Sequence, residues 1–99
     1  MHARSGAFRL SSDKVDEAIS AFEDEQLQKY KEQDGYKGFT LLADRDSGAL
    51  LGISFWESED ALSASDELGE EARSQIKDRG EAEADPETMR WEVVVDDTA

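Results

Sequence analysis

Four side chains of this sequence are best suited to hold a small ligand. Trp56 and Trp91 carry large flat rings that stack well on aromatic molecules, and Phe39 lies in an apolar run that precedes Trp56. Arg4 places a cation within a partly apolar run, where a charge requires a partner. We therefore predict ligand contacts from Arg4, Phe39, Trp56 and Trp91. Core packing at strand ends is the competing interpretation for each tryptophan.

Other polar residues have simpler structural interpretations. His2 could present a second basic group to an anionic ligand, although a histidine so close to a chain end is usually solvated. Arg73 is expected to pair with Glu70 one turn away rather than reach a pocket. The segment Asp44-x-Asp46-x-Gly48 lacks the third ligand and the final glutamate of a calcium loop, so it is predicted to be a hairpin turn. No metal site is expected, and no catalytic residue is assigned.

The composition excludes several classes of partner and chemistry. Lys and Arg number 11 against 25 Asp and Glu, which gives a net charge of −14. Such a chain repels nucleic acid and anionic membranes, so the Gly35-x-x-Gly38 spacing is not expected to form an RNA-binding loop. The chain has no cysteine, which excludes disulfides and thiolate catalysis, and it has no phosphate loop or dinucleotide motif. We expect no cofactor. We also expect a cytoplasmic location, because neither an apolar span nor a secretory signal is recognisable.

The candidate residues fall on a regular series of elements. Strands are predicted at residues 2–10, 36–43, 49–56 and 88–95, and helices at about 13–34 and 58–79. Ser11-Ser12-Asp13 and Ser58 are the predicted helix caps, and Gly35 is predicted to end the first helix in a left-handed conformation. This order predicts one domain over residues 1–99, an α+β fold of the ferredoxin-like βαββαβ type, with an antiparallel four-stranded sheet and two helices on one face.

The predicted strands are apolar on both sides. The third strand alternates Leu51, Ile53 and Phe55 with Leu50, Gly52 and Trp56. Two short helices can cover only one face of the sheet, so the other face is expected to be buried by a second copy of the chain. The pattern predicts a homodimer.

At this point the sequence resembles the dimeric α/β-barrel superfamily, and within it the antibiotic-biosynthesis-monooxygenase-like domains. The resemblance extends over nearly the whole chain and is carried by Ala3-Arg4-Ser5 with Phe8, Gly35-Tyr36-Lys37-Gly38, Asp44-Arg45-Asp46-Ser47-Gly48 and Trp56-Glu57-Ser58-Glu59-Asp60-Ala61-Leu62. It implies two sheets paired face to face and a pocket between sheet and helices.

The resemblance also implies a choice of functions. Some relatives are cofactor-independent oxygenases and others degrade heme, using an asparagine, a tryptophan and a histidine or arginine. This chain has no asparagine, its only histidine is His2, and residues 58–79 contain no tryptophan. The expected function is binding or oxidation of a small aromatic molecule in the sheet–helix pocket without a cofactor. The alternative is a non-catalytic ligand-binding or structural dimerisation domain.

Overall fold

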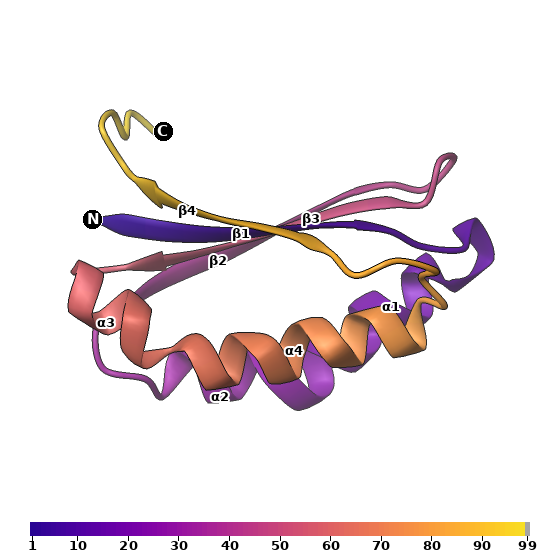
Figure 1. Ribbon diagram of the computed structural model, residues 1–99, viewed down its shortest axis with the longest axis horizontal. Coiled ribbons are helices and arrows are strands. Elements are labelled where there is room, and N and C mark those ends of the chain that lie inside the picture. The colour runs from indigo at the N-terminus through magenta and orange to yellow at the C-terminus, as the bar shows by residue number, and fades with distance from the viewer. Residues whose placement is uncertain (99) are drawn as a thin grey trace.

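The computed structural model describes residues 1–98. Four strands are formed by β1 (His2–Arg9), β2 (Tyr36–Asp44), β3 (Ala49–Trp56) and β4 (Glu87–Glu92). The first helical region consists of η1 (Ser12–Lys14), α1 (Val15–Ala21), η2 (Phe22–Gln26) and α2 (Leu27–Lys31), and the second of α3 (Glu59–Ala64) and α4 (Asp66–Arg79). Figure 1 shows that all helices lie on one side of the sheet and leave its other side bare.

The strands form one antiparallel sheet in the order β2-β3-β1-β4. This is the ferredoxin-like arrangement, so the predicted fold class is confirmed. The register pairs Arg4 with Ser54 and Arg90, and it pairs Ala3 with Phe55 and Trp91. Because side chains alternate along each strand, even-numbered residues of β1 face the helices and odd-numbered ones face the bare side.

The first helical region contains a π-helical segment that the sequence pattern does not reveal. It spans η2, and the wider turn there brings Phe22 and Gln26 into the interior, where both are buried. Tyr30 follows in α2 and is also buried. Phe22, Gln26 and Tyr30 therefore all face the core, although the backbone that carries them is not a uniform α-helix.

The second helical region is broken, whereas one continuous helix was expected. Ser65 separates α3 from α4, and its hydroxyl donates a hydrogen bond of 2.6 Å to the carbonyl oxygen of Leu62. A serine that bonds the backbone in this way competes with the α-helical hydrogen-bond pattern. Arg4 stabilises the break, because its guanidinium donates to the Ser65 hydroxyl (3.0 Å) and to the Leu62 carbonyl (3.1 Å).

Two of the three predicted helix ends are confirmed. The Ser58 hydroxyl accepts a hydrogen bond from the Ala61 amide at 3.1 Å, and Gly35 has a φ of +81°. The predicted side-chain cap at residues 11–13 is wrong. The first helical region begins with a 3₁₀ turn, in which the Lys14 amide donates a hydrogen bond to the Ser11 carbonyl oxygen. The Ser11 side chain makes no capping hydrogen bond.

The last strand is shorter than predicted. It ends at Glu92. One further backbone hydrogen bond follows, which the Val93 amide donates to the Met1 carbonyl oxygen next to the start of β1. Within residues 1–98, Val94 and Val95 belong to no strand, and both are highly exposed.

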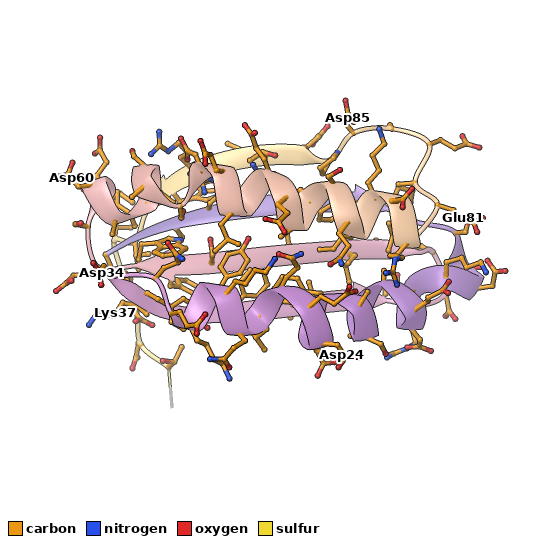
Figure 2. All side chains as sticks on the ribbon, turned by 90° about the horizontal axis from the view of Figure 1, so that it is seen from below. Asp24, Asp34, Lys37, Asp60, Glu81 and Asp85 are labelled. Carbon is orange, nitrogen blue, oxygen red and sulfur yellow. The ribbon has the colours of Figure 1, made fainter. Side chains whose placement is uncertain are left out.

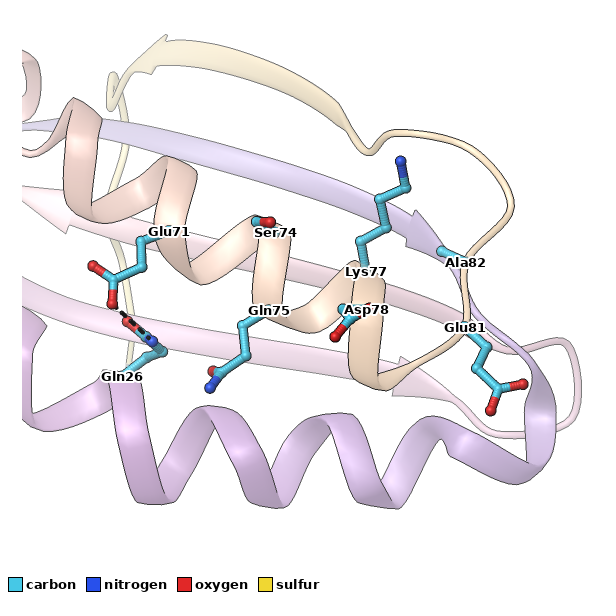
Figure 3. Close-up of a pocket in the computed structure, with 8 residues that line it drawn as sticks. All are labelled: Gln26, Glu71, Ser74, Gln75, Lys77, Asp78, Glu81 and Ala82. Carbon is cyan, nitrogen blue, oxygen red and sulfur yellow. Dashed lines mark hydrogen bonds between the residues drawn. The ribbon is translucent and has the colours of Figure 1, made fainter.

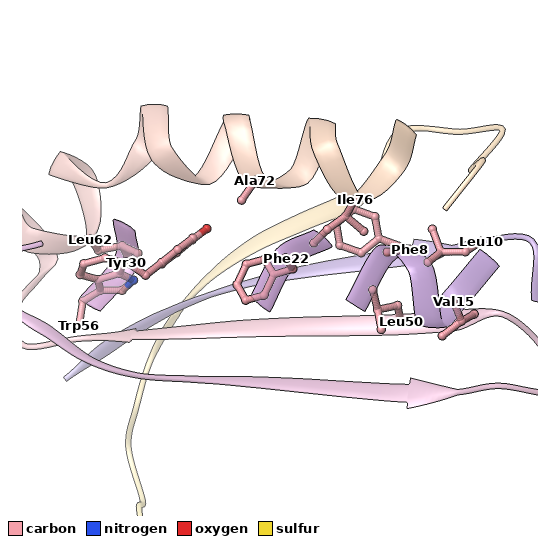
Figure 4. Packing of buried hydrophobic residues seen from close by; sticks show 11 residues of the cluster. Phe8, Leu10, Val15, Phe22, Tyr30, Leu50, Trp56, Leu62, Ala72 and Ile76 are labelled. Carbon is pink, nitrogen blue, oxygen red and sulfur yellow. The ribbon is translucent and has the colours of Figure 1, made fainter. Parts of the chain in front are cut away.

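The core lies between the sheet and the helices. Phe8, Leu50 and Trp56 contribute from the strands, and Phe22 and Ile76 contribute from the helices. Figure 4 shows these side chains pointing into the same layer. By contrast, the labelled carboxylates and Lys37 in Figure 2 project away from it at the periphery. No helix within residues 1–98 is long and apolar enough to cross a membrane.

Candidate ligand-binding site

A small cavity lies in the layer between the sheet and the helices. Its volume is about 20 Å³, and its walls include Arg4, Phe22, Tyr30, Phe39 and Arg73. This space holds about one water molecule, whereas pockets for drug-sized ligands measure roughly 300–1,000 Å³. An aromatic ligand can therefore enter only if these side chains move apart.

Three aromatic rings form one wall of the cavity. The ring centroids of Phe22 and Phe39 are 4.6 Å apart, and those of Tyr30 and Phe39 are 5.1 Å apart in an edge-on arrangement. Tilted and edge-on pairs are the favourable geometries for such rings. The rings come from η2, α2 and β2, so this wall is shared between the first helical region and the sheet.

Arg4 also lines the cavity and is held firmly in place. It is 6% exposed, it forms an ion pair with Asp66, and it makes the two hydrogen bonds described above. Burial lowers the pKa of Arg4, and the negative charge of Asp66 opposes that shift. Arginine keeps its charge in proteins, so the ion pair places a fixed cation beside the cavity.

Tyr30 presents a neutral hydroxyl to the interior. Burial raises the pKa of Tyr30 above its usual value, while the nearby charges of Arg73 and Arg4 act in the opposite direction. The phenol therefore stays protonated at neutral pH. Figure 4 shows that the hydroxyl points away from Trp56 and toward the part of α4 that carries Ala72.

Solved structures share this architecture over nearly the whole chain. A monooxygenase of Streptomyces coelicolor, in complex with nanaomycin D, superposes with a TM-score of 0.79 at 16% identity, covering 99% of this chain and 91% of the other. The heme degrader MhuD of Mycobacterium tuberculosis, with two hemes in its active site, gives 0.75 at 19% identity, covering 99% and 100%. SnoaB of Streptomyces nogalater, a cofactor-independent oxygenase, gives 0.68 at 13% identity, covering 96% and 94%.

The chain has the fold of the antibiotic biosynthesis monooxygenases. At these identities the similarity establishes the monooxygenase fold and leaves the reaction to be argued from the residues.

Sequence comparison adds relatives of unassigned activity. No family model matches the chain. The uncharacterized protein Rv2557 of Mycobacterium tuberculosis is 34% identical over 67 residues, which is 68% of this chain and 30% of that protein. The uncharacterized protein MT2634 from another strain matches equally. The chain thus matches less than a third of the length of these curated relatives.

The monooxygenase fold places the four predicted ligand-binding residues in different environments. Arg4 and Phe39 line the cavity. Trp56 is fully buried beside it, with its indole N–H donating to the Ser54 hydroxyl at 2.8 Å and its ring 6.2 Å from that of Tyr30. Trp91 lies outside the cavity on the bare face of the sheet, where it is 48% exposed and donates to the Ser5 hydroxyl.

The remaining basic candidates also differ in position. His2 faces α3, with its imidazole Nε2 3.7 Å from the carboxylate of Glu59. The expected ion pair between Arg73 and Glu70 is wrong, because within residues 1–98 no carboxylate lies within ion-pair distance of Arg73. Arg73 lines the cavity instead. Phe22, Tyr30 and Arg73 are the site residues that sequence reasoning missed. For Arg73, the available signal was its position directly after the buried Ala72 of α4.

A larger groove on the helical surface has the wrong chemistry for an aromatic ligand. It measures about 740 Å³ and lies between η2 and α4, with polar walls that include Gln26, Glu71 and Asp78 (Figure 3). The Gln26 amide donates to Glu71 at 3.4 Å, and Lys29 binds the same carboxylate at 2.7 Å. These two hydrogen bonds lower the pKa of Glu71, so it remains ionised. Within the described part of the chain, no group of three or more potential ligands could hold a metal ion.

Proposed function

We propose that this domain binds a small, flat aromatic molecule in the cavity between the sheet and the helices. The observation that carries the proposal is the cavity itself, which is lined by the rings of Phe22, Tyr30 and Phe39 and also by Arg4 and Arg73. Aromatic walls with a few convergent polar groups are typical of sites for such ligands.

Entry of the ligand requires the cavity to widen. The π-helical segment that carries Phe22 is the part of the wall best suited to yield, because π-turns are less regular than the α-helix around them. The Arg73 side chain is also able to swing, since within residues 1–98 no hydrogen bond or ion pair holds its guanidinium.

The similarity to oxygenases supports oxidation of the bound molecule without a cofactor. Solved neighbours include a monooxygenase and a cofactor-independent oxygenase. In such a reaction the substrate itself is the reductant, and one oxygen atom of O₂ enters the ring system while the other leaves as water. Tyr30 and the two arginines are the groups of this chain able to stabilise an ionised aromatic oxygen during that step.

The proposal predicts quenching of Trp56 emission by a bound ligand. The Trp91→Phe variant retains Trp56 as its only tryptophan, and this ring lies next to the cavity-lining Tyr30. Titration with 2-hydroxy-1,4-naphthoquinone is expected to quench its emission along a saturable curve. The matched Trp56→Phe variant, which retains Trp91 on the other face, is expected to show only weak quenching without saturation.

Measuring oxygen uptake alongside these titrations distinguishes an oxygenase from a protein that only binds the ligand. Consumption of oxygen when an oxidisable aromatic compound is added would support an oxygenase, whereas saturable binding without oxygen uptake would identify a ligand-binding protein. Absence of saturable quenching in Trp91→Phe would contradict the proposed site.

We also propose that the domain is a homodimer joined through the bare face of the sheet. The outward side chains across the middle of the sheet are uncharged: Ala3, Ser5, Ala7, Thr40, Leu42, Leu51, Ile53, Phe55, Met89 and Trp91. In a chain with 36% charged residues, an apolar surface of this extent favours a protein interface. The similarity to the dimeric α/β-barrel superfamily supports the same arrangement.

A further inference from the structure

Arg73 is a cation with no protein partner in the described part of the chain. Its side chain is partly buried and lines the cavity, and residues 1–98 offer it neither a carboxylate within ion-pair distance nor a hydrogen-bond acceptor. Most cations elsewhere in this acidic chain do have acidic partners, as Arg45 does with Asp16 at 2.9 Å. A partly buried guanidinium without such a partner requires a counter-charge from elsewhere.

A second guanidinium lies next to it. An ideal Cβ atom at Gly69 would stand 2.7 Å from one terminal nitrogen of Arg73 and 3.2 Å from one of Arg4. Both groups therefore pack against the bare backbone of Gly69. Asp66 neutralises only Arg4, so Arg4 and Arg73 together keep an excess positive charge.

The Tyr30 side chain completes the cluster. It lines the same cavity as both arginines, and the positive charges of Arg73 and Arg4 act against the rise in its pKa that burial causes. Guanidinium groups bind planar anionic oxygens through two parallel hydrogen bonds, and a neutral phenol donates a third. The cluster is thus complementary to a carboxylate or an ionised phenol attached to an aromatic ring.

We propose that Arg73, packed beside Arg4 over Gly69, binds an anionic oxygen of the aromatic ligand and makes the site selective for acidic aromatic molecules. This inference rests on the proposed function, because it names the class of ligand for the same cavity. Gly69 acts as a specificity-determining position, since any side chain there would displace the Arg73 guanidinium.

The test compares ligands of the same shape and different charge. Isothermal titration calorimetry with naphthalene-2-carboxylate and naphthalene-2-carboxamide measures the contribution of the charge. The carboxylate is expected to bind at least about ten-fold more tightly, as for a charge-assisted pair. A second comparison, of 2-hydroxy-1,4-naphthoquinone with 1,4-naphthoquinone, shows whether an ionised ring oxygen binds as well as a carboxylate.

Variants then assign the preference to Arg73. Arg73→Gln is expected to abolish the preference for the carboxylate over the carboxamide, and Gly69→Ala, which displaces the end of the same side chain, is expected to reduce that preference. Melting temperatures of both variants, measured in parallel with the wild type, separate lost binding from misfolding. Arg45→Gln removes the same charge from the β2–β3 hairpin and is expected to leave the preference intact.

Each outcome has a distinct meaning. Equal affinity for carboxylate and carboxamide would overturn this inference and leave the proposed aromatic site standing. A preference that persists in Arg73→Gln would also overturn it. Failure of all four ligands to bind the wild-type protein would overturn the proposed function and this inference with it.

Discussion

Replacing Trp56 with alanine is expected to lower the free energy of unfolding by about 4 kcal/mol. The ring is fully buried, contacts Tyr36 edge-on at 5.9 Å between centroids, and donates its N–H to Ser54. The substitution removes the apolar contacts and leaves a cavity that the surrounding strands and α3 cannot fill. Since small domains are stable by only about 5–15 kcal/mol, the variant is expected to be close to unfolding at physiological temperature.

Thermal and urea denaturation followed by circular dichroism measure this loss. The matched variant Trp56→Phe retains an aromatic ring and is expected to lose only about 1–2 kcal/mol. A Trp56→Ala variant as stable as the wild type would show that the ring does not stabilise the core. That result would favour the interpretation of Trp56 as a ligand contact.

Replacing Ile53 with glutamate is expected to convert the proposed dimer into a monomer. Ile53 lies on the bare face of the sheet among Leu51, Phe55 and Trp91, where the proposed partner would bury it. An unpaired carboxylate in such an interface costs about 3 kcal/mol or more, and the two-fold symmetry introduces it twice. The dissociation constant is therefore expected to rise by more than about 100-fold.

Light scattering at micromolar concentration checks this result. The wild type is expected at twice the chain mass of 11.0 kDa, and Ile53→Glu at the chain mass. Ser20→Glu adds the same charge at an exposed position of α1 and is expected to remain dimeric. A wild-type protein that is monomeric under these conditions would contradict the proposed interface.

The fold was predictable from local patterns. Alternation along β3 separates Trp56 from Phe55, and the recurrence of apolar residues at roughly helical spacing predicts a helix that carries Phe22 and Tyr30 on its buried face. Each pattern depends only on near neighbours in the chain. The four-strand, two-helix order then leaves few possible topologies.

The candidate site was predictable only in part. Trp56 and Trp91 have similar sequence contexts, but the register of β1 with its two neighbours places them on opposite faces. The meeting of Arg4 with Arg73 depends on the helix break at Ser65 and on the missing side chain at Gly69. Arg4 lies more than 60 positions from Ser65, Gly69 and Arg73 in the chain, and no periodic pattern encodes contacts over that separation.

The most direct test of the central claim is where an aromatic ligand lies in the folded protein. The chain has three isoleucines, of which Ile76 lines the cavity and Ile53 lies on the bare sheet face. With isoleucine methyl groups labelled, nuclear Overhauser effects from the ring protons of naphthalene-2-carboxylate report its position. We predict contacts to Ile76 and none to Ile53. Contacts to Ile53 alone would place the ligand on the sheet surface and contradict a binding site between the sheet and the helices.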